Sequence, residues 1–179
     1  ATGGFVDGRG LAAALSLGAE GIAMGTRLSV TKESPVHEAA KRATIEKSIE
    51  DTIYSNRFDG IYCRVMKTKS AEKAVKRGMS LPRAALASFS IAKMLDLPWL
   101  KLALGTVVKG PGILLQLAHF ATAFNAIKAA TEDGDLNKGV HLIGQAQGII
   151  HDLPTVDQLI KRTVAEAKAI QKKMGGQLK

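Results

Sequence analysis

The first 27 residues constrain the fold more than any other part of the sequence, because two glycine-rich turns flank one helical segment there. Gly3-Gly4 forms the first turn, a helix is expected over about 8–17, and the apolar segment 21–24 leads to a second turn at Gly25-Thr26. On neighbouring parallel strands, two such turns direct backbone N–H groups at one phosphate, and Thr26 adds a hydroxyl donor. A (β/α)8 barrel holds a phosphate after strands seven and eight. From the spacing alone, a phosphate site and two ordinary tight turns are equally open.

Composition indicates one domain with a real core. The chain has 179 residues, 46% of them hydrophobic and only 4% aromatic, which favours helix-rich α/β packing over an all-β fold. The single cysteine, Cys63, excludes a disulfide framework and is typical of a reducing compartment. No N-terminal signal pattern is present, so a cytoplasmic location is expected.

The net charge of +9 raises the question of a nucleic-acid partner. Residues 41–80 carry 10 basic and 5 acidic side chains, and the densest basic run, 67–77, contains no aromatic residue for base stacking. We expect a solvated helix face and no nucleic acid, with an acidic carrier or another anionic surface as the alternative. The apolar region 97–130 is interrupted by polar residues, so no run approaches the roughly 20 residues of a membrane span.

The remaining elements are predicted from caps, turns and periodicity. Ser34 is expected to cap a helix that begins at Pro35 and continues to Ile45 or beyond. Residues 51–68 are expected to form a small hairpin or an edge strand around the Asp-Gly turn at 59–60. Further helices are expected over about 82–95, 98–108, 112–131 and 155–174. The last begins with the capping-box pair Thr155 and Gln158.

Other candidate chemistry is weak. The spacing Gly8-x-Gly10-x-x-Ala13 matches a dinucleotide fingerprint, but it follows a Gly-Gly loop and no suitable second strand closes a Rossmann unit. No two histidines form a metal-like pair, so no metal site is expected. His119 is expected in a helix core, and His37 in a structural or capping role.

Residues 1–27 closely resemble the FMN-binding segment of the nitronate monooxygenase family, formerly called 2-nitropropane dioxygenases. The matching segments are 3–10, 18–21 and 24–27. A second match, from Glu132 to Asp135 and on to Gly144-Gln145 and Gly148, resembles the C-terminal segment of the same enzymes. Two ordered matches so far apart are more specific than either alone. The resemblance therefore extends over nearly the whole chain.

The resemblance implies an α/β fold: the C-terminal part of a (β/α)8 TIM barrel, around strands seven and eight, with a mostly helical subdomain. It assigns 1–50 to the end of the FMN-binding barrel, 51–80 to an extended hairpin excursion and basic helix, and 81–179 to the helical subdomain. Because such a barrel takes about 250 residues, the first six strands and the family's catalytic histidine would precede this chain. The chain alone is then expected to be inactive, with the N-terminal half of the same enzyme as its partner and a homodimer as a further expectation.

The resemblance also implies a site and an activity. FMN contacts are expected at six positions in the two turns, namely Gly3, Gly4, Ala23, Met24, Gly25 and Thr26. Family members often carry Gln at the position of Ala23, so a backbone contact is expected there. Gln145 is expected to orient substrate or flavin, with loop capping as the structural alternative.

The implied activity is oxidation of alkyl nitronates with molecular oxygen. One alternative of the same fold is an NAD(P)H-dependent enoyl-acyl-carrier-protein reductase, which also uses flavin. Another, from a different class, is a non-catalytic helical interaction module that keeps the glycine turns without their ligand.

Overall fold

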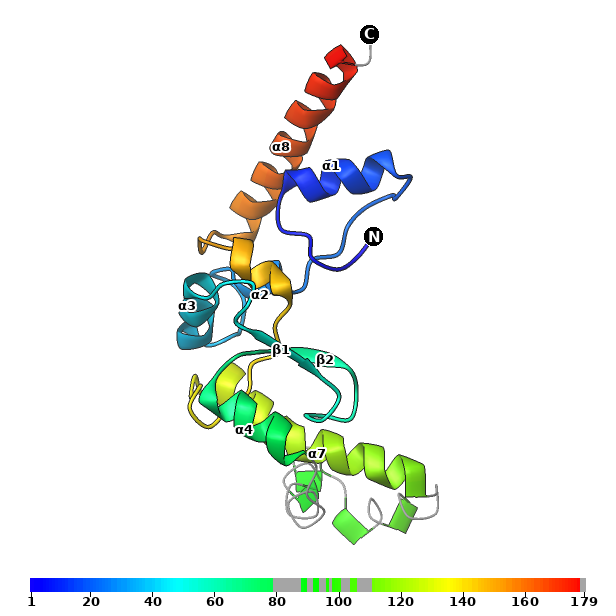
Figure 1. The fold of residues 1–179 in the computed structure, drawn as a ribbon, viewed down its shortest axis with the longest axis vertical. Coiled ribbons are helices and arrows are strands. Elements are labelled where there is room, and N and C mark those ends of the chain that lie inside the picture. Colours follow the sequence, from blue (N-terminus) through cyan, green and yellow to red (C-terminus); the bar gives the residue numbers. More distant parts are fainter. Residues whose placement is uncertain are drawn as a thin grey trace. The chain divides into compact units, whose positions relative to one another are not determined.

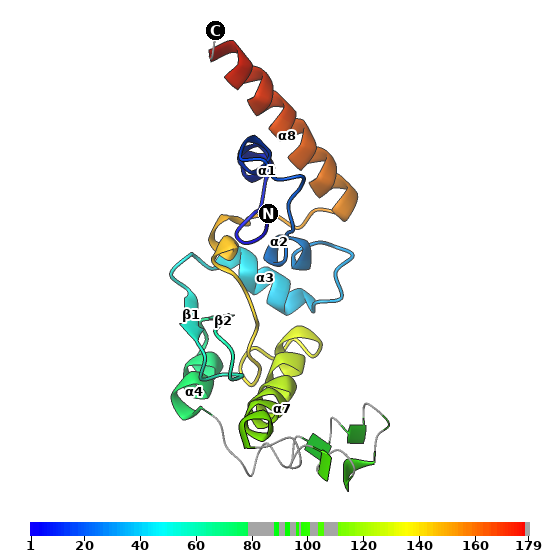
Figure 2. The ribbon, with the colours of Figure 1, turned by 90° about the vertical axis from the view of Figure 1, so that its right-hand side faces the viewer.

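A computed structural model describes residues 1–78, 88–89, 92–93, 96, 98–100, 104–105 and 111–177 (Figures 1 and 2). Two compact units make up the chain. The first comprises Ala1–Asp51 and Ile143–Lys179, and the second comprises Thr52–Leu142.

The first unit contains a pair of packed helices, α1 (Gly8–Ser16) and α8 (Val156–Gln177). Figures 1 and 2 both show α1 lying beside α8, although the two helices are far apart in sequence. The Asp7 carboxylate caps α1 by accepting hydrogen bonds from the N–H groups of Arg9, at 3.0 Å, and Gly10, at 3.3 Å. Both helices match their predicted ranges to within a few residues.

The predicted capping box of α8 is confirmed. The hydroxyl of Thr155 accepts from the N–H of Gln158 at 3.1 Å, and the side-chain oxygen of Gln158 accepts from the N–H of Thr155 at 3.0 Å. Glu33, from a distant loop, accepts from the N–H of Val156 at 3.0 Å. The other oxygen of this carboxylate lies 3.1 Å from the same N–H, so two local bonds and a forked long-range bond fix the start of α8.

Gly8 sets the close approach of α1 to α8. A Cβ atom at this position would lie 2.5 Å from both the Cβ of Glu166 and the carbonyl oxygen of Thr163, which belong to α8. We expect Gly8→Ala to lower the free energy of unfolding by about 1–3 kcal/mol, because the helices must separate to admit the methyl group. Urea unfolding of the complete protein measures this. The control is Gly175→Ala in α8, where no atom lies within 4 Å of the added Cβ; equal losses in the two variants would contradict the packing argument.

Three short elements complete the first unit: α2 (Thr26–Ser29), α3 (Glu38–Glu46) and the 3-10 helix η1 (Gln145–Ile149). Val6, Val30, Ala146 and Ile150 form a buried cluster. This cluster joins the beginning of the chain to the segment around η1.

The prediction that Ser34 caps a helix beginning at Pro35 is wrong. The Ser34 hydroxyl accepts from the N–H of Val36 at 3.3 Å, which forms a local turn, and α3 begins only at Glu38. His37 is the N-cap, with its Nδ1 accepting from the N–H of Ala39 at 3.1 Å. The capping role considered for His37 is therefore confirmed.

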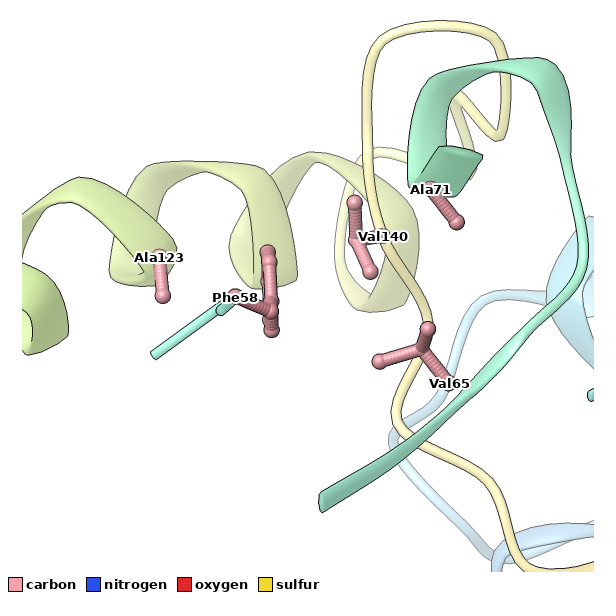
Figure 3. Close-up of a cluster of buried hydrophobic side chains, with 5 residues drawn as sticks. All are labelled: Phe58, Val65, Ala71, Ala123 and Val140. Atoms are coloured by element: carbon pink, nitrogen blue, oxygen red, sulfur yellow. The ribbon is translucent and has the colours of Figure 1, made fainter. Parts of the chain in front are cut away.

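The second unit contains the predicted hairpin, formed by β1 (Thr52–Ser55) and β2 (Cys63–Met66). The strands are antiparallel and pair Ile53 with Val65 and Tyr54 with Arg64. The helices α4 (Lys69–Arg77) and α7 (Pro111–Thr131) follow. Figure 3 shows the buried cluster of this unit, to which α7, α4, β2 and the loops contribute Ala123, Ala71, Val65, Phe58 and Val140.

α7 agrees with the helix predicted over 112–131. The helices predicted over 82–95 and 98–108 lie largely outside the described residues. Among the helices that are described, none combines the length and the apolar character needed to cross a bilayer.

Candidate functional site

Two turns, residues 3–4 and 24–26, lie side by side in the first unit; we call them the paired turns. Thr2 and Ala23 form a parallel β-bridge, and the N–H of Ala23 donates to the carbonyl of Ala1 at 2.8 Å. Because the bridge is parallel, the two bridged segments run in the same direction, and both turns follow at their C-terminal ends. The sequence placed Gly3-Gly4 and Gly25-Thr26 after neighbouring parallel strands. In the structure the segments before the two turns meet in this one isolated bridge and form no strands, and the bridge alone brings the turns together.

The backbone of the paired turns is open. Gly3 and Gly4 have φ angles of +97° and +75°, which favour glycine, and both residues are exposed. No atom lies within 4 Å of a Cβ built on Gly3, Gly4 or Gly25. The N–H groups of Gly4, Gly25 and Thr26 have no hydrogen-bond acceptor among the residues that the structure describes. A ligand with acceptor oxygens could therefore approach these donors without displacing protein atoms.

Thr26 connects the paired turns to the second matching segment of the sequence. Its Oγ1 accepts a hydrogen bond from the N–H of Gly144 at 2.9 Å, across a separation of 118 residues. A Cβ on Gly144 would lie 3.2 Å from this oxygen, so the contact favours glycine. Because Oγ1 acts as the acceptor, the hydroxyl proton of Thr26 stays available for a ligand.

Arg27 anchors the chain directly after the paired turns. Its side chain is 1% exposed, and its guanidinium donates to Oδ1 of Asp152 at 2.7 Å and to the Asp152 carbonyl at 3.2 Å. Arg162 donates to the other carboxylate oxygen at 2.7 Å. Burial lowers the pKa of Arg27, although the carboxylate opposes this. The charge of Arg27 is thus matched within the protein, which makes it a structural residue rather than a free cation.

The hydrogen bonds of Arg162 and Arg27 hold the pKa of Asp152 below its ordinary value, against a raising effect of burial. The sequence contained Arg27 within the matching segment 24–27 but gave no sign of its partner. Asp152 lies 125 residues away, and only the fold brings it to Arg27.

The structure separates the roles of two nearby glutamines in η1. The side chain of Gln145, the predicted substrate residue, is exposed. Gln147 is fully buried, and its Nε2 donates to the carbonyls of Ser48 at 2.8 Å and Asp51 at 3.0 Å. Sequence reasoning missed Gln147 because the two glutamines stand in the same short run, and the turn of η1 alone decides which is buried.

We expect Gln147→Ala to destabilise the complete protein by about 2–3 kcal/mol, since it removes a donor shared by two carbonyls and leaves a cavity. Gln145→Ala is the matched control and should change stability by less than about 0.5 kcal/mol. Thermal unfolding of the two variants measures the difference. A loss in Gln145→Ala as large as that in Gln147→Ala would contradict these roles.

His141, in the second unit, is 3% exposed, and within the described residues neither ring nitrogen has a hydrogen-bond partner. Burial lowers its pKa to about 4, so the ring is neutral near pH 7. Burial, followed by the nearby Asp59 carboxylate, raises the pKa of the half-buried Cys63 thiol to about 11, so the thiol stays protonated near pH 7. The side chain of His119 lies outside the described part, and the described residues contain no cluster of three metal-ligating side chains.

Two solved structures share the fold of this chain. FabK from Thermotoga maritima matches with a TM-score of 0.67 at 28% identity, over 98% of this chain and 45% of that one. A nitroalkane oxidase from Streptomyces ansochromogenes matches with a TM-score of 0.63 over 97% of this chain and 40% of that one. At 20% identity the second match concerns the fold alone. The expected α/β class agrees with these neighbours.

Residues 1–166 match the family described as nitronate monooxygenase, and the chain belongs to this family. The predicted family is therefore confirmed. A relative from Mycobacterium tuberculosis, named (3aS,4S,5R,7aS)-5-hydroxy-7a-methyl-1-oxo-octahydro-1H-indene-4-carboxyl-CoA dehydrogenase, is 36% identical over 172 residues, covering 93% of this chain and 48% of its own. A probable nitronate monooxygenase from Staphylococcus haemolyticus is 38% identical over 72 residues, covering 40% of this chain and 20% of its own. The chain spans about half the length of the curated relatives that are similar over 93% of it.

Proposed function

We propose that the complete protein is an FMN-dependent oxidoreductase and that the paired turns bind the FMN phosphate. Residues 1–50 would then form the C-terminal end of a (β/α)8 barrel, where a phosphate site is typical. The observation that carries this proposal is the parallel bridge between Thr2 and Ala23, which sets two open glycine turns next to each other.

The residues of the paired turns have the donors that a phosphate needs. The N–H groups of Gly4, Gly25 and Thr26 are without protein partners among the described residues, and the Thr26 hydroxyl retains its proton. Gly3, Ala23 and Met24 shape the backbone around them, and Ala23 acts through its main chain. The flavin, when bound, accepts and donates the electron pair of the reaction. The protein residues described here bind and orient it, while proton transfer belongs to residues outside this chain.

For the substrate we propose an acyl-CoA thioester. Support comes from the relatives named as carboxyl-CoA dehydrogenases, which are similar over 93% of this chain. The probable nitronate monooxygenases are similar over about 40% of it. Nitronate oxidation with oxygen remains the second candidate, because the family description carries that name.

Turnover by the flavin-loaded complete protein tests the substrate class. We expect an acyl-CoA to bleach the flavin absorbance without oxygen, as electrons pass to the cofactor, and an artificial acceptor to restore it. The acyl-CoA assay is the first arm of the experiment. In the second arm the protein receives an alkyl nitronate with oxygen, and in the third it receives NAD(P)H with an enoyl thioester. Turnover confined to the nitronate arm would contradict the acyl-CoA proposal. Turnover confined to the third arm would keep the thioester but reverse the direction of the reaction.

A further inference from the structure

The outer face of the β1–β2 hairpin carries two exposed tyrosines and an arginine that the core does not use. We propose that Tyr54, Tyr62 and Arg64, which we call the tyrosine face, bind the adenine nucleotide of coenzyme A. This inference rests on the proposed acyl-CoA substrate and deepens it, because it assigns the second unit a role in substrate recognition.

The side chains of the tyrosine face are already arranged as a stack. The rings of Tyr54 and Tyr62 have centroids 5.5 Å apart at an interplanar angle of 29°. The guanidinium carbon of Arg64 lies 5.2 Å from the centroid of the Tyr54 ring. Its Nη1 also donates to the hydroxyl of Thr52 at 2.8 Å, which holds the arginine over the ring. Contacts within the protein therefore hold the three side chains together.

The register of the hairpin explains why these residues are available. Val65 packs in the cluster with Phe58 and Val140 (Figure 3). Its cross-strand partner Ile53 packs against this cluster. Side chains alternate between the two faces of a strand, so the next pair, Tyr54 and Arg64, lies on the opposite face.

Exposure makes the tyrosine face unusual. Tyr54 is 60% exposed and Tyr62 is 65% exposed, although tyrosine carries a large apolar ring. Neither ring packs in the hydrophobic core that the described residues of the second unit form. A face that leaves aromatic rings open and fixes a cation above one of them is suited to a planar, negatively charged ligand.

Charge favours a nucleotide over an apolar partner. The second unit, 52–142, carries 13 basic and 6 acidic side chains, for a net charge of +7, whereas the first unit carries 12 and 10, for +2. In the loop of the hairpin, the guanidinium of Arg57 donates to the backbone carbonyl of Lys76 at 3.1 Å, which fixes one further cation in this unit. The nucleotide of coenzyme A combines an adenine ring with a diphosphate and a 3′-phosphate. The ring can stack on tyrosine, and the phosphates can pair with arginine.

Calorimetry with adenosine 3′,5′-bisphosphate tests the site apart from turnover. We expect the flavin-loaded complete protein to bind this probe, and Tyr62→Ala to weaken binding about tenfold or more, as the loss of base stacking does elsewhere. Tyr62→Phe should keep the affinity because it keeps the ring. Arg64→Gln should weaken binding, and its matched control is Lys128→Gln, which removes one charge from α7 of the same unit and should have little effect.

Kinetics give a second readout. Tyr62→Ala should raise KM for an acyl-CoA about tenfold with kcat unchanged, because the nucleotide lies outside the reacting atoms. With the matching pantetheine thioester, which lacks the nucleotide, Tyr62→Ala and the unaltered protein should behave alike.

Two results would overturn the inference. If the protein turns over acyl-CoA but does not bind the bisphosphate, the tyrosine face is not a nucleotide site, while the proposed function still holds. A change of oligomeric state in Tyr62→Ala, with nucleotide binding preserved, would make this face a protein interface instead. Binding of the bisphosphate with the expected variant effects, but without acyl-CoA turnover, would support the nucleotide site while contradicting the proposed function.

Discussion

Gly4→Val should leave the complete protein with little or no bound flavin. Gly4 has a φ of +75°, where a β-branched residue is strained, and its N–H is one of the donors proposed for the phosphate. The valine side chain would also occupy the space in front of the turn, which no protein atom fills within 4 Å. We expect the dissociation constant for FMN to rise more than about tenfold, since a strain of about 1–3 kcal/mol adds to the steric block. Fluorescence titration with FMN measures it.

Gly18→Val is the matched control for backbone strain. Gly18 has a φ of +90°, is exposed, and likewise has no atom within 4 Å of a Cβ placed on it, but it lies in the turn after α1 and outside the paired turns. It should lose comparable stability and keep its flavin. If Gly4→Val folds and binds FMN as tightly as Gly18→Val does, Gly4 is not part of the phosphate site.

Asp152→Asn should destabilise the complete protein by about 3–5 kcal/mol, because it leaves the buried guanidinium of Arg27 without its ionic partner. Arg162→Gln removes the other half of the network, but its side chain is 55% exposed, so we expect a loss of less than about 1 kcal/mol. Urea unfolding of the two variants near pH 7 measures the asymmetry. Equal losses would contradict the view that the buried Arg27 makes this carboxylate important.

The same carboxylate predicts how stability depends on pH. The pKa of Asp152 is lower in the folded protein than its ordinary value, so the folded state favours the ionised form. Its stabilising contribution is complete above the ordinary pKa and is lost as the pH falls through the folded pKa. From about pH 7 to about pH 3, Asp152→Asn should therefore lose less stability than the unaltered protein.

Local patterns predicted much of the fold. The capping-box pair located α8, and the Asp-Gly turn at 59–60 located the hairpin. Ser34 misled because serine followed by proline is equally compatible with a turn, and its hydroxyl bonds to Val36 instead of starting a helix. α2, with only four residues, was too short to show a periodicity.

The candidate site was predictable only where it depends on backbone freedom. Glycines mark positions where the backbone takes conformations closed to other residues, so the two turns could be located from the sequence. The β-bridge of Thr2 with Ala23 brings the turns together. Long-range hydrogen-bond partners could not be predicted from local patterns. The bond from Gly144 to Thr26 and the pairing of Arg27 with Asp152 depend on packing between segments more than a hundred residues apart. Gln147 was missed for the same reason, since burial within η1 is decided by the surrounding fold.

A comparison of FMN with riboflavin tests the central claim most directly, because the two ligands differ only in the phosphate. If the paired turns bind that phosphate through several backbone donors, the complete protein should bind FMN at least about a hundredfold more tightly than riboflavin, as two or more hydrogen bonds to a charged group imply. Equal affinity for the two flavins would contradict the account, because the phosphate would then contribute nothing to binding.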